Sequence, residues 1–350
     1  MTNSGAITLT TGDLTITQSG TSPSFTTTGT ITIGAGRVFT ISGGTVAVSS
    51  GTLGGAGTLA LAGTTATITP AFTLGGLSVT TSTATFTTPF TLGALTTSGS
   101  TLTLPAGLTT ATTALSLTTS TINGTGTLTN ASGQTMTVTG GTLNMPLDNQ
   151  GTLVFGGTGT FTAAVTNAGT GTLRVLGQSV SSTASLTIAT GFTNAGAIDL
   201  TSANLGFSAT LTVTSGTLTN TGVITSSIGA GGPRTINAPV NNTGTLTVAS
   251  GGTGLLTIGG PFTTSGIVNL KVGGTTSITQ YDRLAITGTA TLGGTLNVTL
   301  VNSFTPAPGN QFTALTTTGA LSGTFATTNV PSRIVQPVTY NANAVLLVGQ

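Results

Sequence analysis

Apolar and small polar residues alternate along the chain in short bursts, with the period of two that is typical of β-strands. Each burst is about four residues long and is bounded by Gly, Ser or Pro. Early examples are residues 7–10, 14–17, 31–33, 46–48 and 59–61. No segment shows the 3.6-residue period of a helix. The pattern therefore predicts an all-β fold built from many short strands.

Two internal repeats run through this pattern. In the first half, residues 69–77 recur 18 or 19 residues later as residues 88–95. In the second half, the repeated motif is an apolar residue followed by x-Asn-x-Gly. Its asparagines are Asn149, Asn167, Asn194, Asn220 and Asn242, and a looser copy contains Asn130. Successive asparagines are 18 to 27 residues apart, which is the length of one coil of a parallel β-helix (β-solenoid), whereas a propeller blade needs about 40 residues.

The asparagine motif predicts a corner of each coil. Asn and Gly both tolerate positive φ, so the chain can turn there between two faces. Stacked coils would place Asn over Asn and let the amides hydrogen-bond along the axis. We interpret these side chains as a structural turn ladder, with a ligand-binding ladder as the alternative. At about 20 residues per coil, we expect about thirteen coils before Tyr281.

Composition agrees with this prediction. The 350 residues include 90 Thr and 54 Gly, but no Glu, His, Cys or Trp. β-Branched residues suit strands and glycine suits turns. Disordered chains combine low hydrophobicity with high charge, whereas 37% of these residues are hydrophobic and 3% are charged.

The number and spacing of the charged residues argue against nucleic acid as a partner. The net charge is +2, and the basic residues lie far apart at Arg37, Arg174, Arg234, Lys271, Arg283 and Arg333. Nucleic-acid binding needs clustered basic side chains, so we expect none.

No apolar run approaches the ~18 residues of a membrane span, and the N-terminal residues do not resemble a signal peptide. We therefore expect no membrane span in this chain, and an export signal outside it.

The repeat pattern and the composition of the sequence change at Tyr281. The repeats end, and Phe and Pro become more frequent. We expect residues 1–280 to form the β-solenoid repeats and residues 281–350 to form a C-terminal capping segment. Its predicted core consists of Tyr281, Phe304, Phe312, Phe325 and Tyr340.

Residues 281–350 also carry a family resemblance. They run from Tyr-Asp-Arg-Leu at 281–284 through Gly-Thr-Leu-Asn-Val at 294–298 to Phe-Thr-Pro-Ala-Pro-Gly-Asn-Gln-Phe at 304–312. This order resembles the end of bacterial autotransporter passengers and related large β-strand-repeat surface proteins. The resemblance implies an exported, right-handed parallel β-helix with a C-terminal β cap. The translocating barrel that would follow in such proteins is missing from this sequence.

Catalytic chemistry is poorly supported by these residues. Without His or Cys, zinc sites and Ser-His-Asp or Cys-His nucleophiles are excluded. Asp148 and Asp199, the closest carboxylates in sequence, are 51 residues apart, which is roughly 10 Å along a solenoid axis and too far for a glycosidase pair. We expect no enzyme activity, no cofactor and no metal site. Asp282 and Arg283 are interpreted as a surface ion pair or a contact at the junction with the cap.

Threonine motifs raise one further hypothesis. Thr-x-Thr recurs at residues 8–10, 15–17, 137–139 and 245–247, and ranked threonines on a β-helix face are a design of some ice-binding proteins. The spacings are irregular, which argues against an ordered lattice, and outward threonines follow from β propensity alone.

These observations favour a non-catalytic structural or adhesin-like protein that is secreted or on the cell surface. Its partner would be a host or cell-surface ligand, or another copy associating through the coil ends. The alternatives are a self-assembling extracellular filament subunit and an ice- or polysaccharide-binding protein.

Overall fold

The computed structural model describes residues 1–178, 183–204 and 206–350. These residues form 39 strands joined by turns and loops, with no helix. Contacts divide them into unit 1 (Met1–Gly151 and Gly159–Ala163) and unit 2 (Thr152–Thr158 and Ala164–Gln350), and β19 (Thr152–Phe161) has residues in both. The all-β prediction is therefore confirmed.

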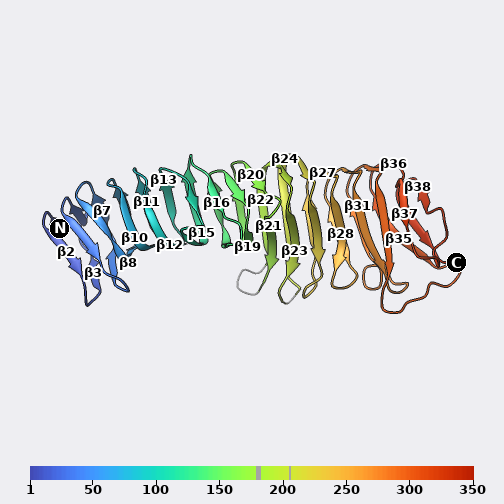
Figure 1. Ribbon diagram of the computed structural model, residues 1–350, viewed down its shortest axis with the longest axis horizontal. Helices are drawn as coiled ribbons and strands as arrows, with labels where there is room; N and C mark the ends of the chain where they lie inside the picture. Colours follow the sequence, from blue (N-terminus) through green and yellow to red (C-terminus); the bar gives the residue numbers. More distant parts are fainter. Residues whose placement is uncertain (179–182, 205) are drawn as a thin grey trace. The chain divides into compact units, whose positions relative to one another are not determined.

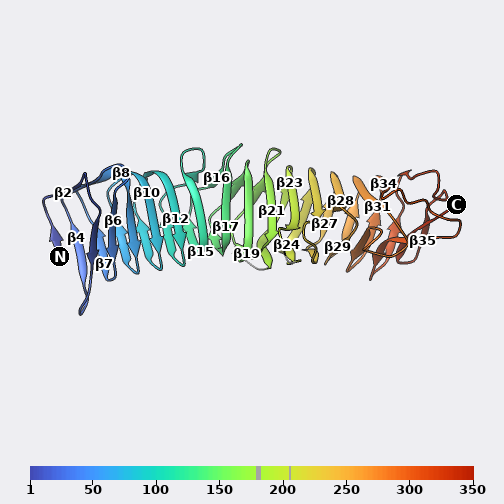
Figure 2. The same cartoon turned by 90° about the horizontal axis from the view of Figure 1, so that it is seen from below.

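Within each unit, strands one turn apart lie side by side, and the turns follow one another in chain order in Figure 1 and in the turned view of Figure 2. The strands of unit 1 are β1 (Thr2–Asn3), β2 (Ala6–Leu9), β3 (Leu14–Thr17), β4 (Ser24–Thr27), β5 (Thr30–Ile33), β6 (Val38–Ser42), β7 (Thr45–Val48), β8 (Thr52–Ala62), β9 (Thr65–Ile68), β10 (Phe72–Thr80), β11 (Thr83–Phe86), β12 (Thr91–Ser98), β13 (Thr101–Leu104), β14 (Leu108–Thr109), β15 (Ala114–Gly124), β16 (Leu128–Asn130), β17 (Thr135–Asn144) and β18 (Leu147–Asn149). The strands of unit 2 are β20 (Val165–Asn167), β21 (Thr172–Gly177), β22 (Ala184–Asn194), β23 (Ala197–Ser202), β24 (Ala209–Asn220), β25 (Val223–Ser227), β26 (Arg234–Asn237), β27 (Val240–Asn242), β28 (Thr245–Ser250), β29 (Leu255–Ile258), β30 (Phe262–Thr264), β31 (Ile267–Val272), β32 (Arg283–Ile286), β33 (Ala290–Leu292), β34 (Thr295–Leu300), β35 (Gln311–Thr317), β36 (Leu321–Gly323), β37 (Thr327–Asn329), β38 (Thr339–Asn341) and β39 (Ala344–Val348).

Each unit is a parallel β-solenoid, because a strand pairs with the strand one turn later in parallel register. In unit 2, one inward position is occupied on successive turns by Leu186, Leu211, Ile236, Ile258 and Ile286. All five side chains are buried. The two units together contain about 12 turns, fewer than predicted, since about thirteen were expected before Tyr281 alone.

Turns in unit 2 have three strand positions, as in β27, β28 and β29. Inward apolar residues alternate with outward polar residues along each strand, which is the pleat that the sequence pattern predicted. The Asn-x-Gly motif forms the corner between the first and second positions. The connection from the second to the third position varies in length, from residues 251–254 after β28 to residues 273–282 after β31 and 301–310 after β34.

Parallel stacking continues past Tyr281, where the sequence repeats end. Strands β32, β33 and β34 pair in parallel with β29, β30 and β31, and β36 and β37 add to β33 and β34. Antiparallel pairing joins β39 to β35 and to β38. The chain therefore carries antiparallel strands near its C-terminus, after further turns of solenoid.

The predicted cap core forms two groups. Phe312 is fully buried, and the rings of Tyr281 and Phe304 meet it edge-on with centroids at 5.5 and 6.0 Å. Phe325 is also buried, and its backbone N–H donates to the hydroxyl of Tyr340 at 3.2 Å. The first group lies where the chain enters the last turns, and the second connects the loop after β36 to β38.

Asp282 links neighbouring turns through the backbone. Its side chain is buried, and its two carboxylate oxygens accept the N–H groups of Gly254 at 2.9 Å and Lys271 at 2.8 Å. Burial raises the pKa of Asp282 to about 7, against the lowering effects of these hydrogen bonds and of the Lys271 charge. The prediction of a surface ion pair between Asp282 and Arg283 is therefore wrong. The two side chains point to opposite sides of the chain, and Arg283 faces outward.

This burial predicts a pH-dependent stability. The folded chain holds the Asp282 proton up to about pH 7, whereas the ordinary pKa is 3.8. The stabilisation is therefore complete below about pH 4 and is lost as the pH rises through about 7, by on the order of 3–4 kcal/mol. Urea unfolding of the full chain across this range measures the change.

The matched variants are Asp282→Asn and, on the exposed Asp13, Asp13→Asn. Asp282→Asn lowers stability below about pH 7, because one backbone N–H then faces an amide NH2, and it removes the slope assigned to residue 282. Asp13→Asn retains the slope. An unchanged slope in Asp282→Asn would contradict the assignment.

Candidate functional site

The six predicted ladder asparagines all lie at the end of a strand, at the corner that follows it. They are Asn130, Asn149, Asn167, Asn194, Asn220 and Asn242, on β16, β18, β20, β22, β24 and β27, and each is at most 1% exposed. We call them the inner ladder. Their burial removes the side chains from contact with a ligand.

The inner ladder is hydrogen-bonded from turn to turn within each unit. In unit 1, the Nδ2 of Asn130 donates to the Oδ1 of Asn149 at 2.7 Å. In unit 2, the same bond joins Asn167 to Asn194, Asn194 to Asn220 and Asn220 to Asn242, at 2.6 to 2.7 Å. The predicted stacking of Asn over Asn is confirmed for these pairs.

A threonine extends the inner ladder by one position in each unit. These two contacts were not predicted. The Thr110 hydroxyl donates to the Oδ1 of Asn130 at 3.1 Å, and the Nδ2 of Asn242 donates to the Thr264 hydroxyl at 3.1 Å. These two threonines stand in an apolar-x-Thr pattern, one coil before and one coil after the asparagine series. Because apolar-x-Thr occurs throughout this chain, the pattern does not single them out.

The reason for Asn and Gly at the corner differs from the prediction. None of the six asparagines has positive φ, and neither do the motif glycines Gly196, Gly222 and Gly244. A Cβ on Gly222 would lie 2.1 Å from the carbonyl oxygen of Gly196. The Asn194 carbonyl accepts the N–H groups of both Thr221 and Gly222. Asn is therefore required by its buried amide, and Gly by the close approach of the next turn.

A second asparagine series lies on the outward face of unit 2, and we call it the outer ladder. It consists of Thr247 on β28, Asn269 on β31, Asn297 on β34 and Asn329 on β37, which occupy one register position. Each asparagine Nδ2 donates to the oxygen of the preceding member, at 3.2, 2.9 and 2.9 Å. Asn269 and Asn297 are half-buried and Asn329 is exposed.

A groove of about 460 Å³ follows the outer ladder. Beside the ladder, it is lined by Ser250, Lys271 and Thr299, and Lys271 and Thr299 are register partners on neighbouring turns. Two ion pairs occur in the part of the chain that the structure describes, Arg37–Asp13 and Arg174–Asp199, and neither includes Lys271. The groove thus presents amides, hydroxyls and one ammonium group together with the apolar residues Ala249, Leu270 and Val298.

Sequence reasoning missed the outer ladder. Its asparagines stand 28 and 32 residues apart and share no motif beyond an apolar residue on either side of Asn269 and Asn297. That alternation was the one available signal, since it places both side chains outward on a strand.

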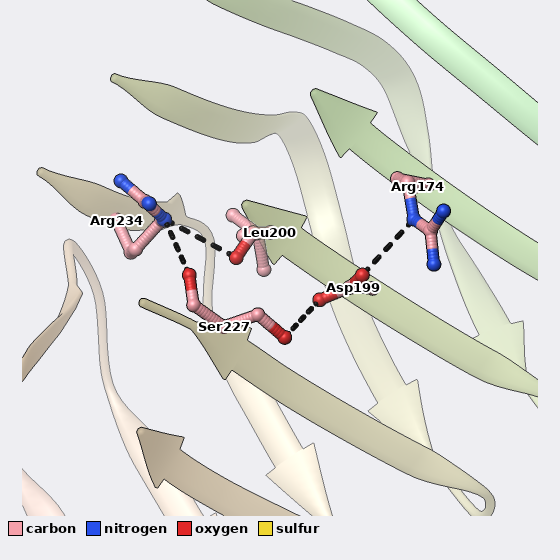
Figure 3. A network of polar contacts seen from close by, with 5 residues as sticks. All are labelled: Arg174, Asp199, Leu200, Ser227 and Arg234. Carbon is pink, nitrogen blue, oxygen red and sulfur yellow. Dashed lines mark hydrogen bonds and ion pairs between the residues drawn. The ribbon is translucent and has the colours of Figure 1, made fainter. Parts of the chain in front are cut away.

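The Asp199 carboxylate, which sequence spacing excluded from a glycosidase pair, belongs to a structural network (Figure 3). It accepts from the Nε of Arg174 at 3.0 Å and from the Ser227 hydroxyl at 2.6 Å. The Ser227 carbonyl in turn accepts from the Nε of Arg234 at 3.1 Å, as the Leu200 carbonyl does at 3.2 Å. Both oxygens of Asp199 are therefore engaged.

Arg234 is a buried cation held by the backbone. It is 3% exposed, and its remaining nitrogens donate to the carbonyls of Gly231, Gly232 and Ile228 at 2.7 to 2.8 Å. Burial lowers the pKa of its guanidinium, and the Asp199 charge opposes that effect. Its many acceptors fix the loop between β25 and β26, so we assign it a structural role.

Unit 1 contains a different surface feature, an ordered array of hydroxyls. One outward register position is occupied on successive turns by Ser24, Thr45, Thr65, Thr83, Thr101, Thr121 and Thr142. Two residues further along the strands stand Thr26, Ala47, Thr67, Thr85, Thr103, Asn123 and Asn144. The irregular spacing in sequence does not disturb this register, because loops absorb the differences in length.

The first-half repeat lines a groove of about 870 Å³ in unit 1. Thr73 and Leu74 stack on Thr91 and Leu92, so the 18-residue repeat is one turn. The rings of Phe72 and Phe90 are parallel at 4.8 Å. Glycines form the floor of this groove. A Cβ on Gly75 would lie 2.0 Å from the Ala56 carbonyl oxygen, so the close stacking of turns requires glycine there. The groove is a consequence of that stacking.

No group of three or more potential metal ligands among Asp, Glu, His and Cys occurs in the described ranges. Those ranges also contain no helix long and apolar enough to cross a membrane. Neither a known protein family nor a curated protein sequence matches the chain.

The inner ladder predicts a large effect of a single substitution. Asn194→Leu leaves the Oδ1 of Asn220 and the Val223 carbonyl without the donor they share, and it removes one acceptor of the Asn167 amide. Unsatisfied buried groups of this kind cost about 1–3 kcal/mol each, so we expect a loss of about 2–4 kcal/mol in the free energy of unfolding. Thermal and urea unfolding measure it.

Two comparisons isolate the amide. Asn194→Asp keeps the shape but replaces the donor with an oxygen that faces the Oδ1 of Asn220, so it is expected to destabilise as well. Thr193→Ala changes the exposed neighbour on the same strand and is expected to have an effect below about 0.5 kcal/mol. Equal midpoints for Asn194→Asp and the unmodified chain would show that the ladder is not a stabilising interaction.

Proposed function

We propose that this protein is a non-catalytic, adhesin-like structural element of the bacterial cell surface. One observation carries the proposal: each of the four carboxylates accepts a hydrogen bond from within the chain. Asp13 accepts the Val38 N–H at 2.9 Å, and Asp148 accepts from the Gln150 amide at 2.6 Å. Asp199 and Asp282 each use both oxygens in the contacts described above. Carboxylates committed in this way are poor general acids or bases.

The solenoid architecture supports the same proposal. Backbone hydrogen bonds and the inner ladder tie each turn to the next, while the outward faces carry mostly hydroxyls and amides. Such a stack presents an extended surface that suits contact with a ligand. The resemblance of residues 281–350 to autotransporter passengers adds export and display on a bacterial surface.

Surface labelling tests the location. Antibodies raised against the folded chain are expected to stain intact cells that produce it, and protease added outside the cells is expected to remove the stain. Beads coated with the chain are expected to adhere to cell or polysaccharide surfaces more than beads coated with heat-unfolded chain. Staining that requires permeabilised cells would exclude this function.

The hydroxyl array of unit 1 favours ice binding as a second candidate function. Its two columns repeat at about 4.8 Å between turns and about 6.6 Å along a strand, which is the scale of the spacing between water molecules on an ice face. In this alternative, unit 1 organises water rather than a macromolecular ligand.

Ice recrystallisation assays test this alternative. If it holds, the chain suppresses growth of ice grains, and Thr83→Tyr, in the middle of the array, removes most of that effect. Thr96→Tyr places the same ring on an exposed threonine of β12 outside the array and serves as the control. Equal inhibition by the two variants, or none by the unmodified chain, would exclude ice binding.

A further inference from the structure

The groove over β28, β31, β34 and β37 carries periodic rows of polar side chains, beside the apolar residues Ala249, Leu270 and Val298. The outer ladder supplies one amide or hydroxyl per turn, about 4.8 Å apart. Beside it, Lys271 and Thr299 form a second polar row. A repeating row of donors and acceptors fits a polymer with repeating hydroxyls, because each monomer can meet an equivalent group on the next turn.

The ladder bonds leave part of each amide available. An asparagine amide has two N–H donors and an oxygen with two lone pairs. The bonds between ladder members use one donor of Asn269, Asn297 and Asn329 and one lone pair of Asn269 and Asn297. These bonds also hold the side chains in fixed orientations, so a ligand loses little additional side-chain entropy on binding.

The charged side chains of unit 2 favour an acidic polymer over a neutral one. Unit 2 contains five of the six basic side chains and two of the four aspartates. The nearest of these aspartates in sequence, Asp282, is buried behind Lys271 with both oxygens bonded to backbone N–H groups. The Lys271 ammonium group, half-exposed in the groove, therefore favours an anionic ligand.

We propose that this groove binds an acidic polysaccharide, with the outer ladder contacting sugar hydroxyls and Lys271 contacting a carboxylate. This inference rests on the proposed surface function and names its ligand class. The groove lining contains no aromatic side chain, so binding depends on hydrogen bonds and charge and is weakened by salt.

Binding of fluorescein-labelled oligogalacturonate to the full chain, followed by fluorescence polarisation, tests the inference. An equally long neutral glucan is the competing probe. We expect the acidic probe to bind more tightly than the neutral one. Lys271→Gln is expected to weaken acidic binding by about five- to tenfold, which corresponds to about 1–1.4 kcal/mol, and to reduce its salt dependence.

Matched variants separate the groove from general charge. Arg333→Gln makes the same change in net charge at an exposed position outside the groove lining, and Asn241→Ala removes an outward amide outside it. Both are expected to bind like the unmodified chain, whereas Asn297→Ala weakens both probes. Unfolding midpoints of all variants establish that the fold is intact.

Three results would overturn the inference: no binding of the acidic probe, equal losses in Lys271→Gln and Arg333→Gln, or equal affinity for the two probes. Each is distinguishable from failure of the surface function, because the labelling of intact cells does not depend on this groove. A surface-labelled chain that binds neither probe would retain the proposed function and lose this ligand.

Discussion

The structure depends on the register between one turn and the next. Parallel backbone bonds define that register, but a parallel ladder by itself does not prevent neighbouring strands from slipping. The inner ladder opposes such slippage, since a shift by one residue would bury an apolar side chain against an amide and move every inward residue outward. Buried amides that bond to their equivalents one turn away, and to backbone carbonyls beside them, therefore specify the alignment as well as contributing stability.

The Asn-x-Gly corner shows how two residue types satisfy one constraint by different means. The asparagine fills a buried position with donors and an acceptor that match the turns on either side. The glycine allows the backbone of that neighbouring turn to approach within a distance that a Cβ would prevent. Neither role requires left-handed backbone geometry, and both disappear if the turns are separated.

Much of the fold could be predicted from the sequence, because alternation and coil-length repeats follow directly from the strand pleat and from stacking. The inner ladder followed from the repeated motif, although positive φ was the wrong explanation. The outer ladder could not be predicted: Asn269, Asn297 and Asn329 become neighbours only after loops of unequal length are placed between the strands. Asp282 was misassigned for a related reason, since its partners are backbone groups at Gly254 and Lys271 that carry no sequence signature.

The connection between the second and third strand positions of unit 2 has a consequence for how such a protein can diversify. It has four residues after β28 and ten after β31 and β34, while the strands on either side keep their register. The strand register therefore accepts connections of different length, apart from positions such as Asp282 and Phe304 that bond to or pack against other parts of the solenoid. Length and sequence can therefore change in the exposed segments of this corner while the stacked strands form an unchanged scaffold.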